Sequence, residues 1–414
     1  MDTVSRRAFL RGLAGVGLCA LGAGALWVDR RWLVDGVPTD KVLPLAGYAR
    51  EAMYYERLGQ AANPEDELDC DACHGPAEPS RTLFCHVPHQ GSYVRCNLCP
   101  HGCILAEGER GLCRVRENRD GSLYTFAYGN PCAIQLDPIE KKPFFHFLPG
   151  ALAFSLATGG CNLRCKYCQN HDISQHAPEE LDSYDAPPET IVRASLQQGA
   201  QAVAFTYSEP MMFYEYMLDT AQLARRAGLR NAVVSAGYVN PDPLRELCRT
   251  VDAIKIDLKG NNDAFYRDVC GGTLEPVLDT IGVIHEMGVH LEIVNLVVPS
   301  LNDNMAELRS LVQWVMDTVG PDVPLHFSRF HPDYQLSHLP PTPVETLEEA
   351  RQAALDAGLH YVYLGNVPGH EGNHTYCPFC SRMIVERSGM ATIAVHIVEG
   401  RCAFCDTPIA GVWT

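Results

Sequence analysis

Apolar and polar positions alternate in a regular order along the middle of the chain. Short apolar runs have the length of buried strands, and the longer runs between them repeat apolar residues at helical spacing. Several helical runs end at a glycine just before the next apolar run, as at Gly199 and Gly228, where a left-handed residue closes a helix. The predicted strands are residues 152–157, 202–207, 231–235, 253–258, 291–298 and 325–329, and the predicted helices include 189–198, 211–227, 274–287 and 305–319.

This alternation of strand and helix predicts βαβ units and a parallel sheet. Six such units form a partial (β/α)6 barrel of the TIM type, to which residues 360–364 add a candidate strand. An open, doubly wound sheet is the alternative arrangement of the same elements. We therefore predict an α/β fold with a barrel-like core between two cysteine-rich modules.

The pattern of apolar and polar residues changes on both sides of this core. Residues 31–90 show little periodicity, whereas the stretch 390–398 is β-branched and apolar. The predicted parts are an N-terminal signal or anchor (1–30), a linker with a Cys/His insert (31–90), a four-cysteine N-terminal module (91–145), the core (146–370) and a zinc-ribbon-like or rubredoxin-like C-terminal module (371–414).

The composition narrows the classes of protein to which the chain can belong. Of its 414 residues, 46% are hydrophobic and 20% charged, which excludes a disordered or fibrous chain. The formal net charge of −17 argues against nucleic-acid binding, because phosphate contacts need Lys and Arg. Fourteen of the 18 cysteines fall into four clusters with ligand-like spacing, so metal or cofactor sites are favoured over a disulfide framework.

One of these clusters directly follows the first predicted strand. Cys161, Cys165 and Cys168 have CxxxCxxC spacing, with Tyr167 before the last cysteine. Three thiolates can bind three irons of a cubane and leave the fourth iron open to a small chelating molecule, whereas a structural zinc loop is the alternative. The loop resembles the signature of radical S-adenosylmethionine (SAM) enzymes. The resemblance implies a [4Fe–4S] cluster whose open iron binds SAM, and reductive cleavage of SAM to a 5′-deoxyadenosyl radical.

Three further elements follow predicted strands at the rim where (β/α) barrels carry their active sites. Residues 206–210 resemble the Gly-Gly-Glu element of the same family, with Tyr and Ser in place of the two glycines. The stretch 257–259 matches its Asp-x-Lys element, and glycyl-radical activases also place a histidine after the sixth strand. The resemblance thus implies SAM contacts from Tyr207, Ser208, Glu209, Asp257, Lys259 and His331. Solvated charges on the rim are the alternative.

Residues 91–386 more closely resemble the radical SAM enzymes of the AmmeMemoRadiSam system, which are similar to pyruvate formate-lyase activating enzymes. The resemblance lies in runs such as Asp137 to Gly150, Cys168-Gln169-Asn170 and Gly365 to Pro368. It implies a mechanism but no defined reaction. The substrate is therefore open between a partner protein, with a glycine as hydrogen donor, and a small molecule, and an electron donor is also required.

Two clusters of four cysteines flank the core. The N-terminal cluster, with His101 as a substitute ligand, could bind one zinc ion or a second iron–sulfur cluster that passes electrons toward the first. Its cysteines could also be buried free thiols. The C-terminal one forms two CxxC knuckles, in which zinc would make a structural cap or docking surface and iron an electron relay. The clusters are Cys96, Cys99, Cys103 and Cys113, and Cys377, Cys380, Cys402 and Cys405.

The insert holds the fourth cluster. Cys70, Cys73 and His74 form the CxxCH pattern of c-type haem attachment. With Cys85 close behind, and His74 or His86 as a fourth ligand, the same residues could instead hold zinc. We favour the zinc knuckle, because the short segment offers little apolar wall for a haem.

The N-terminus resembles a twin-arginine export signal. Arg6 and Arg7 precede an uncharged stretch, residues 12–28, that is short for a membrane span. We expect export to the periplasm or anchoring by this segment, the only membrane contact predicted, with a cytoplasmic location as the alternative. An exported electron-transfer or assembly protein with a non-catalytic barrel is the alternative function.

Overall fold

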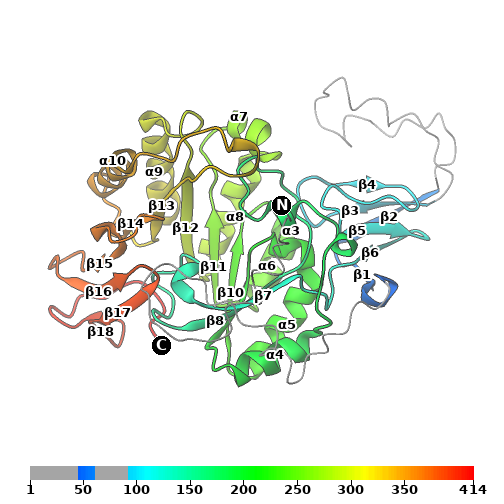
Figure 1. Ribbon diagram of the computed structural model, residues 1–414, viewed down its shortest axis with the longest axis horizontal. Coiled ribbons are helices and arrows are strands. Elements are labelled where there is room, and N and C mark those ends of the chain that lie inside the picture. Colours follow the sequence, from blue (N-terminus) through cyan, green and yellow to red (C-terminus); the bar gives the residue numbers. More distant parts are fainter. Residues whose placement is uncertain (1–44, 61–91) are drawn as a thin grey trace, which may run out of the picture.

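The structure is a computed structural model that describes residues 45–60 and 92–414. Its centre is an eight-stranded sheet in which seven strands run parallel in chain order and β7 pairs antiparallel with β8 (Figure 1). The strands are β7 (Ala133–Pro138), β8 (Leu152–Ala157), β9 (Ala202–Phe205), β10 (Arg230–Ser235), β11 (Ala253–Asp257), β12 (His290–Val297), β13 (Leu325–Arg329) and β14 (Val362–Gly365). The predicted α/β fold is therefore confirmed.

The order of the strands distinguishes a partial barrel from a doubly wound sheet. A doubly wound sheet reverses its strand order, whereas here the order rises without reversal from β7 at one edge to β14 at the other. Because βαβ crossovers are almost always right-handed, this order places the connecting helices on one face. These helices are α4 (Pro188–Gln197), α5 (Tyr214–Arg226), α6 (Pro241–Cys248), α8 (Glu275–Glu286), α9 (Met305–Val319) and α10 (Val344–Asp356).

The two faces of the sheet carry different side chains. The face toward the helices bears large residues such as Phe154, Phe205 and Ile254, which belong to the main core. The opposite face bears alanines at the beginnings of the strands, which pack against Phe144 and Phe147. The segment 139–148 thus fills the inner face, because small side chains leave room there for its aromatic rings.

Two small modules lie at opposite ends of the sheet (Figure 1). The N-terminal module contains β1 (Arg50–Glu51), β2 (Tyr55–Gln60), β3 (Ser92–Cys96), β4 (Ile104–Leu105), β5 (Arg116–Arg119) and β6 (Ser122–Thr125). The C-terminal module contains β15 (Thr375–Tyr376), β16 (Met383–Ser388), β17 (Ala391–Val395), β18 (Ile397–Val398) and β19 (Arg401–Cys402). Short helical turns occupy Leu45–Tyr48, Ile139–Lys141, His171–Ser174 (α3), Pro178–Glu180, Pro210–Phe213, Asp263–Phe265 (α7), Tyr266–Cys270, Tyr334–Leu336 and Glu371–Asn373.

The C-terminal module is attached through the buried segment 139–148. His146 Nδ1 lies 2.6 Å from the carbonyl oxygen of Ala410, and Arg387 Nη2 donates to the carbonyl of Phe145 at 2.7 Å. On the other side of the segment, Glu292 of β12 accepts hydrogen bonds from the backbone N–H groups of Phe145 and His146. The module is therefore tied to the middle of the sheet through buried hydrogen bonds.

The element boundaries differ from the sequence predictions at several places. The strand predicted over 202–207 ends at Phe205, because Tyr207 adopts a left-handed backbone with φ of 67°. The antiparallel strand β7 was not predicted, because polar residues such as Gln135 and Asp137 alternate along this edge strand. The candidate strand at 360–364 is found as β14.

Two predictions concern the N-terminal part of the chain. The signal or anchor in residues 1–30 and the insert with Cys70, Cys73, His74 and Cys85 lie outside the described residues. Within the described ranges, no helix has both the length and the hydropathy needed to cross a bilayer.

Candidate active site

The cysteine loop lies directly after β8 and is held against the turn Tyr266–Cys270. The backbone N–H groups of Arg164 and Lys166 donate to the carbonyls of Cys270 and Val269, at 2.7 and 3.0 Å. Gly160, with φ of 97°, opens the loop where a Cβ would lie 2.7 Å from the carbonyl oxygen of Cys113. Only glycine fits this close approach without displacing the backbone of the neighbouring module.

The three thiols of the loop share one buried environment. Cys165 is 9% exposed, and Cys161 and Cys168 are partly buried. Burial raises the pKa of Cys161, and the charges of Glu209 and the other two cysteines add to this rise. A hydrogen bond from Cys270 instead lowers the pKa of Cys165 to about 7, helped by the positive charge of Lys259. The three thiols thus influence one another and lie within the electrostatic range of two charged groups of the rim, Glu209 and Lys259.

Glu209 brings a buried carboxylate to this loop from the end of β9. Its two oxygens accept hydrogen bonds from Ser235 Oγ at 2.7 Å and from the backbone N–H of Ala236 at 2.9 Å. The side chain is 2% exposed, and burial raises the pKa of Glu209. A carboxylate in such a place is stabilised by a cation, so this corner of the site suits an ammonium group.

The end of β11 supplies the opposite charge. Lys259 Nζ lies 3.0 Å from Asp257 Oδ2, and the buried Lys255 pairs with Asp257 Oδ1. Burial alone would raise the pKa of Asp257, but the two lysines hold it well below its usual range. Asp257 is therefore charged at neutral pH, and Lys259 reaches toward Cys165, whose charge raises the pKa of Lys259 in turn.

Tyr207 and Ser208 direct their side chains away from the cysteine loop. The hydroxyl of Tyr207 donates to Asp137 and accepts from Lys142 Nζ at 2.9 Å, both within the inner face of the sheet. Ser208 Oγ donates to the carbonyl of Thr158 at 2.8 Å. These two side chains hold the turn that carries Glu209, and the Tyr207 carbonyl accepts from Asn170 Nδ2 at 2.8 Å.

The loop after β13 also reaches the cysteine loop. The backbone N–H of Gln335 donates to the carbonyl of Lys166 at 3.0 Å, and the rings of Tyr334 and His171 stack at 4.4 Å between centroids. His331 lies on the same loop, and its side chain is exposed. Its predicted role therefore stays a prediction.

The comparisons with known proteins bear on this arrangement. The sequence profile of the Radical SAM superfamily matches residues 155–315, which include the cysteine loop, Glu209, Asp257 and Lys259. An uncharacterized protein of Methanocaldococcus jannaschii is 48% identical over 318 residues, which cover 76% of this chain and 95% of that protein. The chain belongs to the radical SAM superfamily.

Within this superfamily the chain is homologous to the activating enzymes of pyruvate formate-lyase. The pyruvate formate-lyase 1-activating enzyme of Escherichia coli is 24% identical over 206 residues, which cover 46% of this chain and 84% of that enzyme. A solved domain of such an enzyme from Bacteroides vulgatus is 17% identical over 40% of this chain and all of that domain, with a TM-score of 0.37. The chain is thus an enzyme with radical SAM chemistry.

The residues at the rim fit the [4Fe–4S] cluster and SAM that radical SAM enzymes use. Thiolates are the ligands that iron–sulfur clusters require, and three of them lie in one loop. The buried carboxylate of Glu209 has no basic side chain bound to it in the described residues, and it lies near Cys161. A cationic amino group beside the cluster would stabilise that carboxylate, which agrees with SAM as the occupant.

Sequence reasoning missed two side chains at the radical SAM site. Cys270 lies 3.5 Å from the hydroxyl of Tyr167 and hydrogen-bonds Cys165, although no spacing rule pointed to this isolated cysteine. Lys255, 4% exposed, neutralises Asp257 from within an apolar strand. The signal that could have found Lys255 is its place two residues before Asp257, because side chains two apart in a strand share one face.

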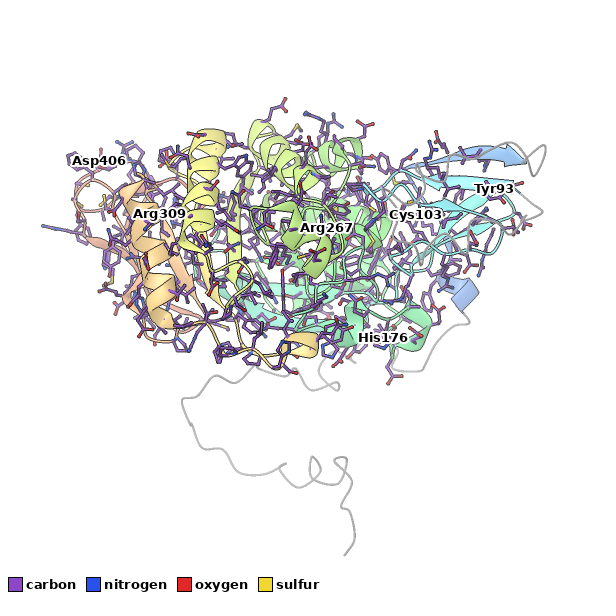
Figure 2. The ribbon with its side chains drawn as sticks, turned by 90° about the horizontal axis from the view of Figure 1, so that it is seen from above. Tyr93, Cys103, His176, Arg267, Arg309 and Asp406 are labelled. Atoms are coloured by element: carbon purple, nitrogen blue, oxygen red, sulfur yellow. The ribbon has the colours of Figure 1, made fainter. Side chains whose placement is uncertain are left out.

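The structure also brings together each of the two flanking sets of cysteines. All cysteines in the described ranges are free, so none forms a disulfide there. In the N-terminal module Cys96, Cys99, Cys103 and Cys113 line one cavity. In the C-terminal module the four sulfur atoms lie within 4.8 Å of one another, a group that can hold a metal ion. Figure 2 shows Cys103 and Asp406, the neighbour of Cys405 in the sequence, toward opposite ends of the molecule.

Proposed function

We propose that Cys161, Cys165 and Cys168 bind the [4Fe–4S] cluster, and that the enzyme abstracts hydrogen from a partner protein. The observation that carries this proposal is a single loop that holds one buried and two partly buried thiols near the charged groups of Glu209 and Lys259. With SAM bound, the cluster supplies a 5′-deoxyadenosyl radical, the chemistry of this superfamily. The protein's own residues bind and orient SAM and exclude water from the radical.

In this proposal, the charged groups of the rim bind the two oppositely charged groups of SAM. Glu209 accepts the amino group of SAM, because its buried carboxylate forms no ion pair among the described residues and the charge of Lys259 acts on it only from a distance. Lys259 contacts the carboxylate end of SAM, while its ion pair with Asp257 holds Lys259 in place. Tyr207 and Ser208 act as positioning residues, since their side chains support the turn before Glu209.

Two observations support a protein as the substrate. The pyruvate formate-lyase activating enzymes are named for a protein that they activate. The C-terminal module exposes several large apolar side chains, and exposed apolar surface is the kind of surface that protein contacts use. These side chains are Phe379, Met390, Ile393, Val395, Val398 and Phe404.

The cleavage of SAM is tested on the full chain, with its clusters rebuilt anaerobically. Dithionite and SAM should yield 5′-deoxyadenosine, measured by liquid chromatography and mass spectrometry. Cys168→Ala should abolish the product, whereas Cys248→Ala, a buried cysteine outside every cluster, should leave it unchanged. A loaded cluster without product would contradict the proposal and favour an electron carrier.

The hydrogen donor is tested with extracts of cells grown in D2O. The extract is divided into a macromolecular and a small-molecule fraction, and each is added to the enzyme with SAM and dithionite. We expect deuterium in 5′-deoxyadenosine only with the macromolecular fraction, and expect protease treatment to remove this transfer. Transfer from the small molecules alone, or from neither fraction, would contradict a protein substrate.

For the C-terminal module we propose one structural zinc ion. The sulfur atoms of Cys377 and Cys405 lie 3.6 Å apart, and those of Cys380 and Cys402 lie 3.8 Å apart. A tetrahedral ion with bonds of about 2.3 Å holds its sulfur ligands about 3.8 Å apart. Zinc analysis of the purified protein tests this proposal, and one iron in its place would contradict it.

For the insert we propose a zinc knuckle on Cys70, Cys73 and Cys85, with His74 as the fourth ligand. The support is the sequence spacing alone. Pyridine haemochrome spectra of protein made where haem attachment operates should show no covalent haem. An absorbing haem that stays with the denatured chain would contradict the zinc knuckle.

For the N-terminus we propose export through the twin-arginine route, or anchoring by the same segment. The support is the pair Arg6 and Arg7 before an uncharged stretch. Residues 1–40 fused to a reporter that is active only outside the cytoplasm should give signal, and replacing both arginines with lysine should remove it. Reporter activity that persists in the lysine variant would contradict the proposal.

A further inference from the structure

The proposed function gives no role to the four cysteines of the N-terminal module. Cys96 ends β3, and Cys99, Cys103 and Cys113 follow in the adjoining loops. From the structure we infer that these four residues bind a second [4Fe–4S] cluster, which lies directly beside the radical SAM loop. This inference goes beyond the proposed function, because the SAM-binding cluster does not need it.

The separation of the thiols favours a cluster over a single ion. All four line one cavity, yet among the described residues only the C-terminal cysteines form a group of three or more ligand atoms within 4.8 Å. A single zinc ion would need its sulfurs about 3.8 Å apart. In a cubane each cysteine binds a different iron, so the ligating sulfurs lie farther from one another. In this structure no three of the N-terminal thiols lie within 4.8 Å of one another, although all four line one common space.

The lining of the cavity suits a cluster as well. Leu98, Leu105, Leu112 and Met212 supply an apolar wall. Arg116, 1% exposed, places Nη1 at 4.0 Å from the sulfur of Cys96, and its Nε has no acceptor within the described part of the chain. A buried donor without an acceptor is rare in folded proteins. The inorganic sulfides of a cluster, which accept N–H hydrogen bonds, would satisfy it.

The cavity also touches the radical SAM loop. Asn162, which follows the cluster ligand Cys161, lines the cavity, and its carbonyl oxygen accepts from His101 Nε2 at 2.7 Å. The ligand Cys113 meets the loop from the other side, since its carbonyl oxygen would lie 2.7 Å from a Cβ at Gly160. Gly160 and Asn162, the two neighbours of the ligand Cys161 in the sequence, thus both contact the N-terminal module. At Gly160 a single residue separates the ligand Cys161 from the ligand Cys113.

This arrangement places a one-electron centre next to the site of SAM cleavage. A low-potential, one-electron donor, for which dithionite serves in the test, reduces the second cluster from the 2+ to the 1+ state. In an exchange between the centres, the second cluster returns to 2+ as the first goes from 2+ to 1+. One electron moves, and no bond or proton changes place.

The test removes each centre separately from the full chain. Replacing Cys161, Cys165 and Cys168 together by alanine removes the first cluster. We expect about four irons and about four acid-labile sulfides to remain, with an electron paramagnetic resonance (EPR) signal that SAM does not alter. The double variant with Cys99→Ala and Cys103→Ala loses the second cluster instead. We expect it to hold about as much iron as the triple variant and to give an EPR signal that SAM does alter. Cys132→Ala, outside the clusters, is the control and should keep about eight irons.

Each outcome decides the inference. A triple variant without iron and without acid-labile sulfide, whatever its zinc content, overturns it. If the triple variant does not fold, the iron content and Mössbauer spectrum of the intact protein decide between about eight irons and about four. If the inference holds, the EPR spectrum of the fully reduced protein differs from the sum of the two variants' spectra, because the two centres are neighbours. Loss of SAM cleavage with both clusters present would contradict the proposed function alone.

Discussion

The two modules at the ends of the sheet offer the same four ligands in different geometries. In the C-terminal module the sulfurs of Cys377 and Cys405 lie 3.6 Å apart, as around one ion. In the N-terminal module the four thiols surround a cavity beside Asn162 of the radical SAM loop. Both sets contain a CxxC pair, one in the N-terminal module and two in the C-terminal module. The comparison therefore teaches that the folded separation of the thiols, and not the presence of a CxxC pair, distinguishes an ion site from a cluster site.

The modules also differ in how they meet the catalytic core. The N-terminal one contacts the cysteine loop itself, through Cys113 against Gly160 and His101 against Asn162. The C-terminal one contacts the segment 139–148, through Arg387 and Phe145. In the account proposed above, the first contact couples a metal site to the reaction, whereas the second contact attaches the C-terminal module to the segment on the inner face of the sheet.

The largest effect is expected when the C-terminal ion site is broken. Cys402→Ala removes a buried ligand, and binding of structural zinc supplies on the order of 10 kcal/mol of folding free energy to small modules. The C-terminal strands should then unfold, zinc should be lost and iron should stay, as measured by metal analysis and limited proteolysis. Loss of iron together with zinc would show that the two modules are not independent.

A smaller effect is expected from the buried ion pair beside the N-terminal cavity. Glu215, 4% exposed, accepts from Arg116 Nη2 at 2.6 Å, so Glu215→Gln leaves the guanidinium without a counter-charge. We expect a loss of about 3–5 kcal/mol in the free energy of unfolding. The uncompensated positive charge should also raise the midpoint potential of the second cluster, measured by EPR-monitored redox titration.

The matched control for this pair is Glu286→Gln. Glu286 pairs with Arg245 at 2.9 Å on the surface and is 65% exposed, so its loss should change stability by less than about 1 kcal/mol. An equal loss of stability in both variants, or an unchanged midpoint potential in Glu215→Gln, would contradict the placement of a charged centre in the cavity.

The contact between the N-terminal module and the radical SAM loop is tested at Gly160. Gly160→Ala would strain a left-handed backbone and press a Cβ against Cys113 and Val115, at a cost of about 2–4 kcal/mol. Gly199→Ala, with φ of 69° and no atom within 4 Å of the added Cβ, should cost about 1 kcal/mol. Chemical denaturation and iron analysis measure both variants, and equal effects would argue against a close contact at Gly160.

The smallest effect is expected at the exposed apolar side chains of the C-terminal module. Phe379 is 78% exposed, so Phe379→Ala should change stability by no more than about 0.5 kcal/mol and leave zinc in place. If a protein substrate docks there, deuterium transfer from the macromolecular fraction should fall in this variant. Leu196→Ala, another exposed apolar residue but on α4, is the control that should leave the transfer unchanged.

Local patterns in the sequence predicted most of the fold. Apolar runs and helix-ending glycines predicted the parallel strands, because both signals lie within a few residues. Strand β7 was missed because its partner β8 lies beyond a segment with several turns, and its alternating polar residues give a weak signal. The end of β9 was placed two residues too late, since nothing local shows that Tyr207 is left-handed.

The candidate site could be predicted only where ligands share a short stretch. The loop Cys161, Cys165 and Cys168 is such a stretch, and the superfamily assignment agrees with it. The pair Arg116 and Glu215 and the contact of Cys165 with Cys270 join residues about one hundred positions apart, so no spacing rule shows them. Membership of the AmmeMemoRadiSam system, export and the metal of the insert stay predictions.

X-ray absorption at the iron and zinc edges tests the contrast between the two modules most directly. The sample is the full chain in which Cys161, Cys165 and Cys168 are replaced by alanine, so that iron can bind only in the N-terminal module, whereas zinc binds in the C-terminal module and in the insert. We predict an iron spectrum with iron neighbours, as in a cubane, and a zinc spectrum with sulfur ligands at about 2.3 Å. Zinc at both sites, or iron without iron neighbours, would contradict the account.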